Sequence, residues 1–144
     1  MYRELIEYDT QEEYRLHFHE NYCKDGILTH DSVKVSFRES VFDHAFFASK
    51  NRRIKDKSVF SIERAKRIGW IKAVLQDESL TLYDGWISSE KRYDPTRRVC
   101  IVTPDKYVVV LRLISDKKAV FVTAYLADSD EVVRKIQKSP RKVI

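Results

Sequence analysis

The chain has 144 residues, a length that suits one domain with a hydrophobic core of its own. Hydrophobic residues make up 43% and charged residues 34%, with three glycines and three prolines, which excludes a disordered or low-complexity chain. The two cysteines lack Cys-x-x-Cys spacing, and no signal sequence or membrane-spanning apolar run is present. We therefore expect a cytoplasmic protein with free thiols and no membrane association.

The charge is unevenly distributed along the chain. Residues 1–31 hold 8 acidic and 3 basic side chains, and the rest of the chain holds 14 acidic and 24 basic ones, so the net charge changes from −5 to +10. A strongly basic body attracts polyanions such as nucleic acids, although a solvated basic surface is an equally ordinary explanation.

The first half of the chain predicts helices and one short strand. A capping box at Thr10 and Glu13 begins an acidic helix over about residues 11–22. The alternation in residues 33–37 predicts a strand, residues 41–47 look helical, and residues 50–57 read as a charged loop. Ser61 is a suitable N-cap for a helix over residues 62–76, which would bury Ile68, Ile71 and Leu75.

The second half predicts a sheet. Residues 80–98 are irregular, and three strands follow at 99–103, 107–114 and 119–126, joined by short turns as an antiparallel meander. A capping box at Asp128 and Glu131 begins a short helix around residues 129–138. The predicted class is therefore α+β, with N-terminal helices packed on one face of an antiparallel sheet and a short C-terminal helix. We divide the chain into an acidic helical segment (1–26), an α+β domain (27–128) and a C-terminal helix with a basic tail (129–144).

Two polar side chains stand out in the last strand. Thr123 and Tyr125 lie two residues apart and therefore on the same pleat face. A tight turn at residues 115–118 would pair Arg112 with Phe121, diagonal to Thr123, so that the three polar groups share one face. Threonine and tyrosine are also common in strands without any function. With Arg112 beside them, they would suit phosphodiester chemistry, which needs cations or fixed donors on the phosphate oxygens.

His44 lies among aromatic residues and is either a core or boundary histidine or a general acid or base. Imidazole titrates near neutral pH, so it can take a proton from a ribose 2′-hydroxyl without any metal. His17, His19 and Cys23 match no standard zinc spacing, and we expect neither a metal nor another cofactor.

Several cations and one aromatic residue are candidates for RNA binding. Arg64 lies on the apolar stripe of its helix, where it either extends to solvent or points across the sheet at an anion. Lys66 and Arg67 follow it and would either form an ordinary solvated face or line a phosphate track. Tyr83, Trp86 and Tyr93 offer stacking surfaces for bases. The predicted RNA-binding set is Arg64, Lys66, Arg67, Trp86, Lys91, Arg92 and Arg97.

Four stretches resemble the phage-associated branch of the barnase–EndoU–colicin–RelE-like nuclease superfamily. They are residues 33–37 with 42–47, residues 61–71, residues 92–98, and the Thr-x-Tyr strand at 121–125. The resemblance implies two helices on a four-stranded antiparallel sheet and metal-independent RNA cleavage, often by a toxin held in check by an antitoxin or immunity protein. By position, it makes His44 the acid/base, Thr123 and Tyr125 the sheet hydroxyls, and Arg98 with Arg112 the phosphate stabilisers.

The sequence thus supports three hypotheses. The first is a metal-independent endoribonuclease that cleaves RNA, such as tRNA, through attack of the 2′-hydroxyl. The second is an RNA-binding module without catalysis. The third is a protein-interaction domain with a basic face, which the acidic first helix covers as an inhibitor would.

Overall fold

The computed structural model describes residues 4–48, 59–87, 91–102, 105–127 and 129–138. The helical elements are α1 (Gln11–Phe18), the π-helix η1 (His19–Cys23), the 3-10 helix η2 (Glu39–Val41), α2 (Phe42–Ala45), α3 (Ile62–Ala65), α4 (Ile68–Leu75) and α5 (Asp130–Gln137). The strands are β1 (Ile27–Leu28), β2 (Lys34–Ser36), β3 (Phe47–Ala48), β4 (Val59–Phe60), β5 (Leu82–Ile87), β6 (Arg92–Val102), β7 (Tyr107–Ser115) and β8 (Lys118–Leu126). None of the helices in these ranges has the length and hydrophobicity that crossing a membrane requires.

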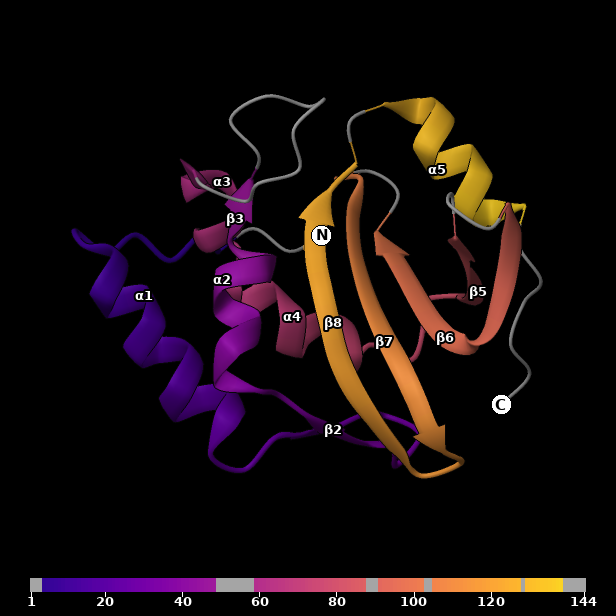
Figure 1. Ribbon diagram of the computed structural model, residues 1–144, viewed down its shortest axis with the longest axis horizontal. Coiled ribbons are helices and arrows are strands. Elements are labelled where there is room, and N and C mark those ends of the chain that lie inside the picture. Colours follow the sequence, from indigo (N-terminus) through magenta and orange to yellow (C-terminus); the bar gives the residue numbers. More distant parts are fainter. Residues whose placement is uncertain (1–3, 49–58, 88–90, 103–104, 128, 139–144) are drawn as a thin grey trace.

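Six strands form one sheet in the order β1-β2-β8-β7-β6-β5, and β3 pairs with β4 in a separate ribbon (Figure 1). Every pair in the large sheet is antiparallel except β2 with β8, which run parallel. The α+β class is confirmed. The sheet is larger than the predicted meander because residues 80–98, predicted to be irregular, form β5 and most of β6.

An irregular pairing explains why the β5–β6 hairpin escaped prediction. Tyr83 pairs with Val99 and Gly85 pairs with Asp94, so four residues of β6 lie opposite Asp84 alone. Such a bulge disrupts the period of two on which recognition of a strand depends.

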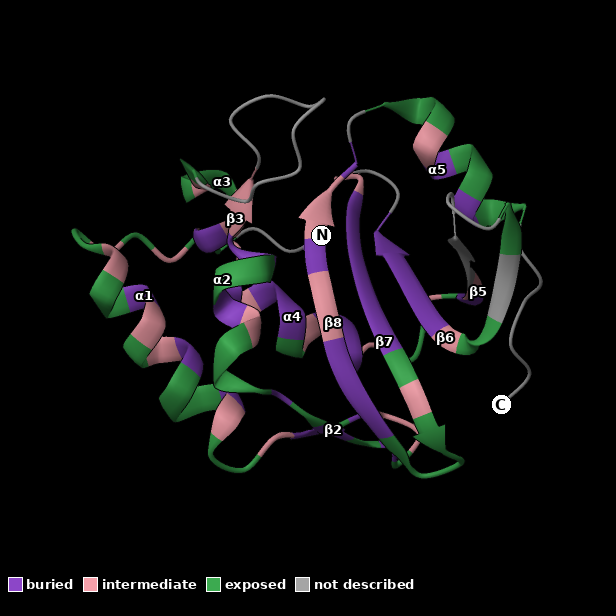
Figure 2. Ribbon diagram, in the orientation of Figure 1, coloured by how far each residue is buried: buried purple, intermediate pink, exposed green. Residues whose placement is uncertain are grey.

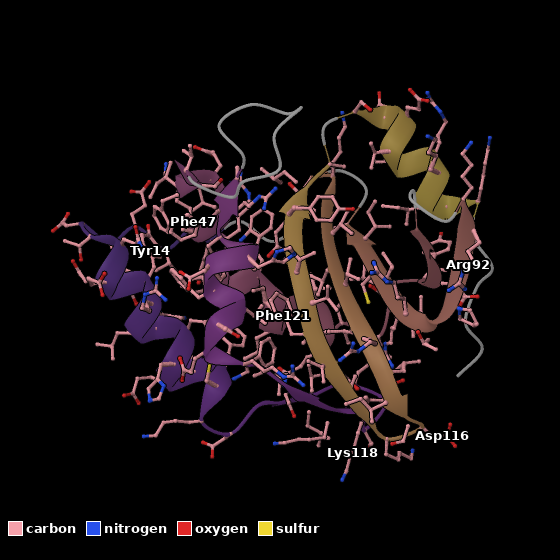
Figure 3. The ribbon with its side chains drawn as sticks, in the orientation of Figure 1. Tyr14, Phe47, Arg92, Asp116, Lys118 and Phe121 are labelled. Atoms are coloured by element: carbon pink, nitrogen blue, oxygen red, sulfur yellow. The ribbon has the colours of Figure 1, made fainter. Side chains whose placement is uncertain are left out.

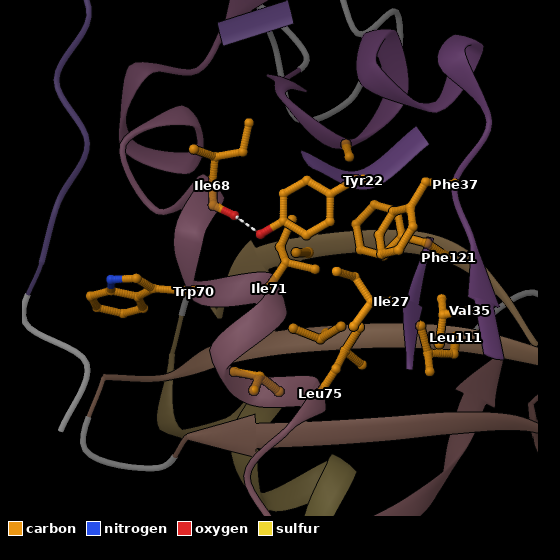
Figure 4. Close-up of a cluster of buried hydrophobic side chains, with 14 of the residues drawn as sticks. Tyr22, Ile27, Val35, Phe37, Ile68, Trp70, Ile71, Leu75, Leu111 and Phe121 are labelled. Atoms are coloured by element: carbon orange, nitrogen blue, oxygen red, sulfur yellow. Dashed lines mark hydrogen bonds between the residues drawn. The ribbon is translucent and has the colours of Figure 1, made fainter. Parts of the chain in front are cut away.

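The first predicted helix is confirmed, and its aromatic side chains enter the main core. Thr10 caps α1 by accepting a hydrogen bond from the backbone N–H of Glu13. Tyr14, Phe18 and Tyr22 are almost completely buried, and the Tyr22 hydroxyl donates to the carbonyl of Ile68 (Figure 4). The acidic segment therefore shares one hydrophobic core with the sheet.

The single helix predicted over residues 62–76 is two helices. Ser61 caps α3 as expected, but at Arg67 the backbone leaves the helical region (φ −95°, ψ 17°) before α4 begins. The break leaves Ile68 and Ile71 in the core, while Arg64 donates hydrogen bonds to the last residue of α2 and to β3. The loop predicted at 50–57 lies outside the described residues.

The two faces of the sheet have separate hydrophobic clusters. On the helix side, α1, α2 and α4 pack against alternate strand residues such as Val109, Leu111 and Phe121. On the other side, α5 covers the intervening residues, including Val108 and Val110. The central strands are accordingly the most buried part of the sheet (Figure 2). The C-terminal helix is confirmed, with Ser129 as its N-cap; Asp128 lies outside the described residues.

Candidate nucleic-acid interface

Arg112, Thr123 and Tyr125 share the α5 side of the sheet, although the register differs from the predicted one. Arg112 pairs with Val120 and not with Phe121, so the predicted pairing is wrong. If the pairing of Arg112 with Val120 continued without interruption, Thr123 would face the helix side of the sheet. Val122 is an extra residue, a bulge, so Thr123 lies opposite Val110 and Tyr125 opposite Val108, and both face the α5 side.

Arg97 lies directly opposite Arg112 across the β6–β7 ladder, so both guanidinium groups are on the α5 side of the sheet. Arg112 is exposed and Arg97 is partly exposed. Like charges directly opposite on adjacent strands repel each other. A phosphate beside the two would accept charge-assisted hydrogen bonds from both guanidinium groups. Sequence reasoning named both arginines but did not pair them, because the pairing depends on the strand register.

Arg98 points the other way and does not belong to this surface. Its backbone partner is Leu111 of the helix-side core, and its side chain is only 4% exposed. Two hydrogen bonds of 2.7 Å join its guanidinium to both carboxylate oxygens of Asp31. Burial alone would raise the pKa of Asp31, but hydrogen bonds from Arg98 and Thr29 outweigh it and hold that pKa well below its usual value. The geometry therefore gives Arg98 a structural role in place of the predicted phosphate contact.

His44 is exposed on α2 and is therefore not a buried core histidine, whereas a boundary histidine agrees with this position. Its neighbours Phe42 and Ala45 are completely buried and fix the short helix, which packs against β8. Asp43 accepts a hydrogen bond of 2.7 Å from Arg15 of α1. The structure thus brings α2 next to the strand that carries Thr123. That the imidazole meets the strand hydroxyls stays a prediction.

The cations of α3 and of the turn that follows it make contacts within the protein, on the helix side of the sheet. Arg64 donates to the carbonyls of Ala45 and Phe47, at 3.3 and 3.0 Å, so it neither extends to solvent nor crosses the sheet. Lys66 pairs with Glu7 at 3.5 Å, and Arg67 pairs with Glu63 at 3.2 Å. These three residues are not brought together with Arg112.

The β5–β6 turn carries the remaining candidates. Lys91 and Arg92 are exposed at its end, the latter marked in Figure 3. The backbones of Trp86 and Tyr93 pair with each other across the β5–β6 hairpin, as expected for two aromatic residues that stack on neighbouring bases. The side chains of Trp86 and Tyr93 lie outside the described part of the structure.

Helix α5 adds cations that sequence reasoning did not assign to the interface. Val133 and Ile136 pack on the sheet, while Arg134, Lys135 and Lys138 are exposed on the same side of the sheet as Arg97 and Arg112. The strong amphipathicity of α5 was the sequence signal that could have identified these exposed cations. Helix α1 lies on the opposite side, so within one chain it does not cover this basic face.

Tyr8 and Glu39 are the partners of the histidines and the cysteine near the N-terminus. His17 Nδ1 lies 2.8 Å from the Tyr8 hydroxyl, and burial lowers the pKa of His17. His19 is hydrogen-bonded to Glu39, and burial together with Glu39 raises the pKa of Cys23 to about 12. Across the described ranges, no three His, Cys, Asp or Glu side chains are arranged to hold a metal ion.

Comparison of the chain with protein-family models, with curated proteins and with solved structures finds no match. The nuclease resemblance therefore remains a hypothesis.

Proposed function

We propose that the protein binds RNA on the α5 side of its sheet. The observation that carries this proposal is the cross-strand pair of Arg97 and Arg112, two cations held side by side on a rigid ladder. Thr123 adds a partly exposed hydroxyl close to this pair, and the exposed cations of α5 lie on the same side of the sheet. Together they suit a phosphate backbone, for which cations and hydroxyl donors are the usual partners.

The test is RNA binding by the Arg112→Gln variant, measured by fluorescence anisotropy with a labelled single-stranded RNA over a series of salt concentrations. Loss of one phosphate contact should weaken binding about tenfold and reduce the slope of log affinity against log salt by about one. The control is Lys72→Gln, which removes the same charge from an exposed site on α4, on the helix side. Equal effects of the two substitutions, or binding that does not respond to salt, would contradict the proposed face.

A second candidate function is metal-independent cleavage of the bound RNA. The exposure of His44 on a helix that packs against β8 favours it. In this reaction His44 accepts the proton of the ribose 2′-hydroxyl, and the 2′-oxygen attacks the adjacent phosphorus. The bond from phosphorus to the 5′-oxygen breaks, and Tyr125 or water protonates that oxygen. The products are a 2′,3′-cyclic phosphate and a 5′-hydroxyl. Arg112 and Arg97, in place of Arg98, stabilise the negative charge that develops on the phosphate. Because α2 packs on the helix side and these arginines lie on the α5 side, the reaction requires the RNA to bend around the edge of β8, which β2 pairs with at Lys118 to Val120.

Incubation of RNA with the protein in the presence of a chelator tests this candidate. We expect fragments with cyclic phosphate ends from the wild-type chain, and a loss of about a hundredfold or more in rate for His44→Ala. Tyr125→Phe should slow the reaction less if water can replace the phenol. Binding without cleavage by the wild-type chain would leave the RNA-binding proposal intact and reject the enzyme.

A further inference from the structure

A second pair of like charges lies on the α5 side of the sheet, near the turn between β7 and β8. Lys34 of β2 is the register partner of Lys118 of β8, and both are exposed; Lys118 is labelled in Figure 3. The residues that follow them, Val35 and Ala119, belong to the helix-side cluster. The turn itself, residues 116–117, carries one aspartate and one lysine, whose charges cancel. Because successive side chains of a strand point to opposite faces, the two lysines lie on the α5 side.

This lysine pair continues the row of cations that Arg97 and Arg112 begin. Arg112 lies opposite Val120, which is two residues beyond Lys118 on the same face of β8. The four cations therefore lie on four neighbouring strands, in the order β6, β7, β8 and β2. Neighbouring strands are about 4.8 Å apart, so the centres of the two pairs are about 12 Å apart when the offset of two residues along β8 is included. Two phosphates of one nucleic-acid strand suit this spacing better than a single phosphate.

The two lysines are not neutralised by neighbouring carboxylates. None of the ion pairs in the described residues includes Lys34 or Lys118, in contrast to Lys66 and Arg67 on the helix side. The ammonium group of Lys34 donates one hydrogen bond to the carbonyl of Asp25. An ammonium group has three donors, so two remain for a ligand. Both lysines can therefore contact a phosphate.

An exposed leucine lies at the end of this row of cations. Leu28 of β1 pairs with Lys34, so it lies on the same face of the sheet, and it is 53% exposed. An apolar side chain beside phosphate-binding cations suits the face of an unstacked base. Bases are accessible in this way in single-stranded RNA, whereas a duplex presents its phosphates and 2′-hydroxyls. The leucine therefore favours a single strand as the ligand.

We propose that single-stranded RNA runs across the strands of the sheet, from the arginine pair on β6 and β7 to the lysine pair on β8 and β2. Lys118 and Lys34 contact a second phosphate of that strand, and Leu28 packs against one of its bases. This assignment rests on the RNA binding proposed above. It adds the direction in which the RNA crosses the sheet and the single-stranded state of the RNA.

Fluorescence anisotropy with a labelled single-stranded RNA tests the path. Lys118→Gln should weaken binding about fivefold to tenfold and reduce the slope of log affinity against log salt by about one. Lys72→Gln, on the helix side, is the matched control and should leave binding unchanged. Since Arg112 and Lys118 contact different phosphates, the factors by which their substitutions weaken binding should multiply in the double variant. Melting temperatures check that each variant is folded, and Lys34→Gln is a second substitution with the same expected effect.

A second measurement compares the single strand with a duplex of the same length and composition. We expect the duplex to bind at least about tenfold more weakly at the same salt concentration, and Leu28→Ala to weaken binding of the single strand about threefold. Duplex binding as tight as that of the single strand would overturn the inference. Equal affinities of the Lys118 and Lys72 variants, with a weakened Arg112 variant, would overturn the path and leave the RNA-binding face intact. Unchanged binding by the Arg112 variant would reject the face itself, and the path with it.

Discussion

The two faces of the sheet differ in what they bury and in what they expose. In the described residues, the helix-side cluster has 25 buried members and the α5-side cluster has 8. The consecutive residues Arg97 and Arg98 show the effect of this difference. Arg98 points to the larger cluster and is neutralised by Asp31, whereas Arg97 points to the smaller one and lies beside Arg112. Most of the hydrophobic burial lies on the helix side, so the α5 side can hold charged side chains near solvent.

Truncation of one large side chain on each face tests this contrast most strongly. Phe121→Ala, in the helix-side core, should lower the free energy of unfolding by about 3–5 kcal/mol, because it leaves a cavity among rigid aromatic rings. Ile136→Ala, under α5, should cost about 2 kcal/mol, because this residue contacts a smaller cluster and α5 can adjust. Urea denaturation measures both values. Equal losses would show that the two faces contribute alike.

The buried ion pair should dominate the acid sensitivity of the protein. The pKa of Asp31 lies below its ordinary value of 3.8, so the unfolded chain binds the proton more readily than the folded one. The pair therefore stabilises the fold above about pH 4, and this contribution is lost as the pH falls further. Asp31→Asn should cost about 3 kcal/mol at neutral pH, because Arg98 is left buried without its counter-charge.

Urea denaturation between about pH 2.5 and pH 7 measures this effect. The wild-type chain should lose stability more steeply than the Asp31→Asn variant as the pH falls below about 4. Parallel curves for the two proteins would show that the pair is not responsible. Asp43→Asn is the control, since the Asp43 carboxylate is 62% exposed and its pair with Arg15 is a surface one.

The exposed arginine should matter least for stability. Arg112→Gln should change the free energy of unfolding by no more than about 0.5 kcal/mol, because the side chain is solvated. Thermal denaturation of the same sample used for RNA binding checks this result. A large loss would mean that Arg112 supports the fold, and any effect on RNA binding would then be indirect.

Local sequence signals predicted much of the architecture. The caps at Thr10 and Ser61 begin helices as expected, and the apolar runs of β7 and β8 form the centre of the sheet. Partners far apart in sequence were not predictable from local patterns. Asp31 and Arg98 are 67 positions apart and meet only because the turn before β2 folds against β6.

The candidate site illustrates the same limit. Thr123, Tyr125 and Arg112 were predicted to share a face, and they do, but through a different register combined with a bulge. Periodicity cannot locate an inserted residue, because apolar side chains are found on both faces of β8. The exposure of His44 was also not predictable from the sequence. Its aromatic neighbours suggested a buried site, but it is these neighbours that point into the core.

The unpaired Val122 has an evolutionary consequence. Removal of this one codon would restore regular pairing along β8 and leave Thr123 opposite Val110 and Tyr125 opposite Val108, so both would stay on the α5 side. A residue gained beside it without a further bulge would instead turn both side chains to the helix side. The position of a single-residue insertion or deletion in this strand therefore decides whether descendants of this gene keep the polar face.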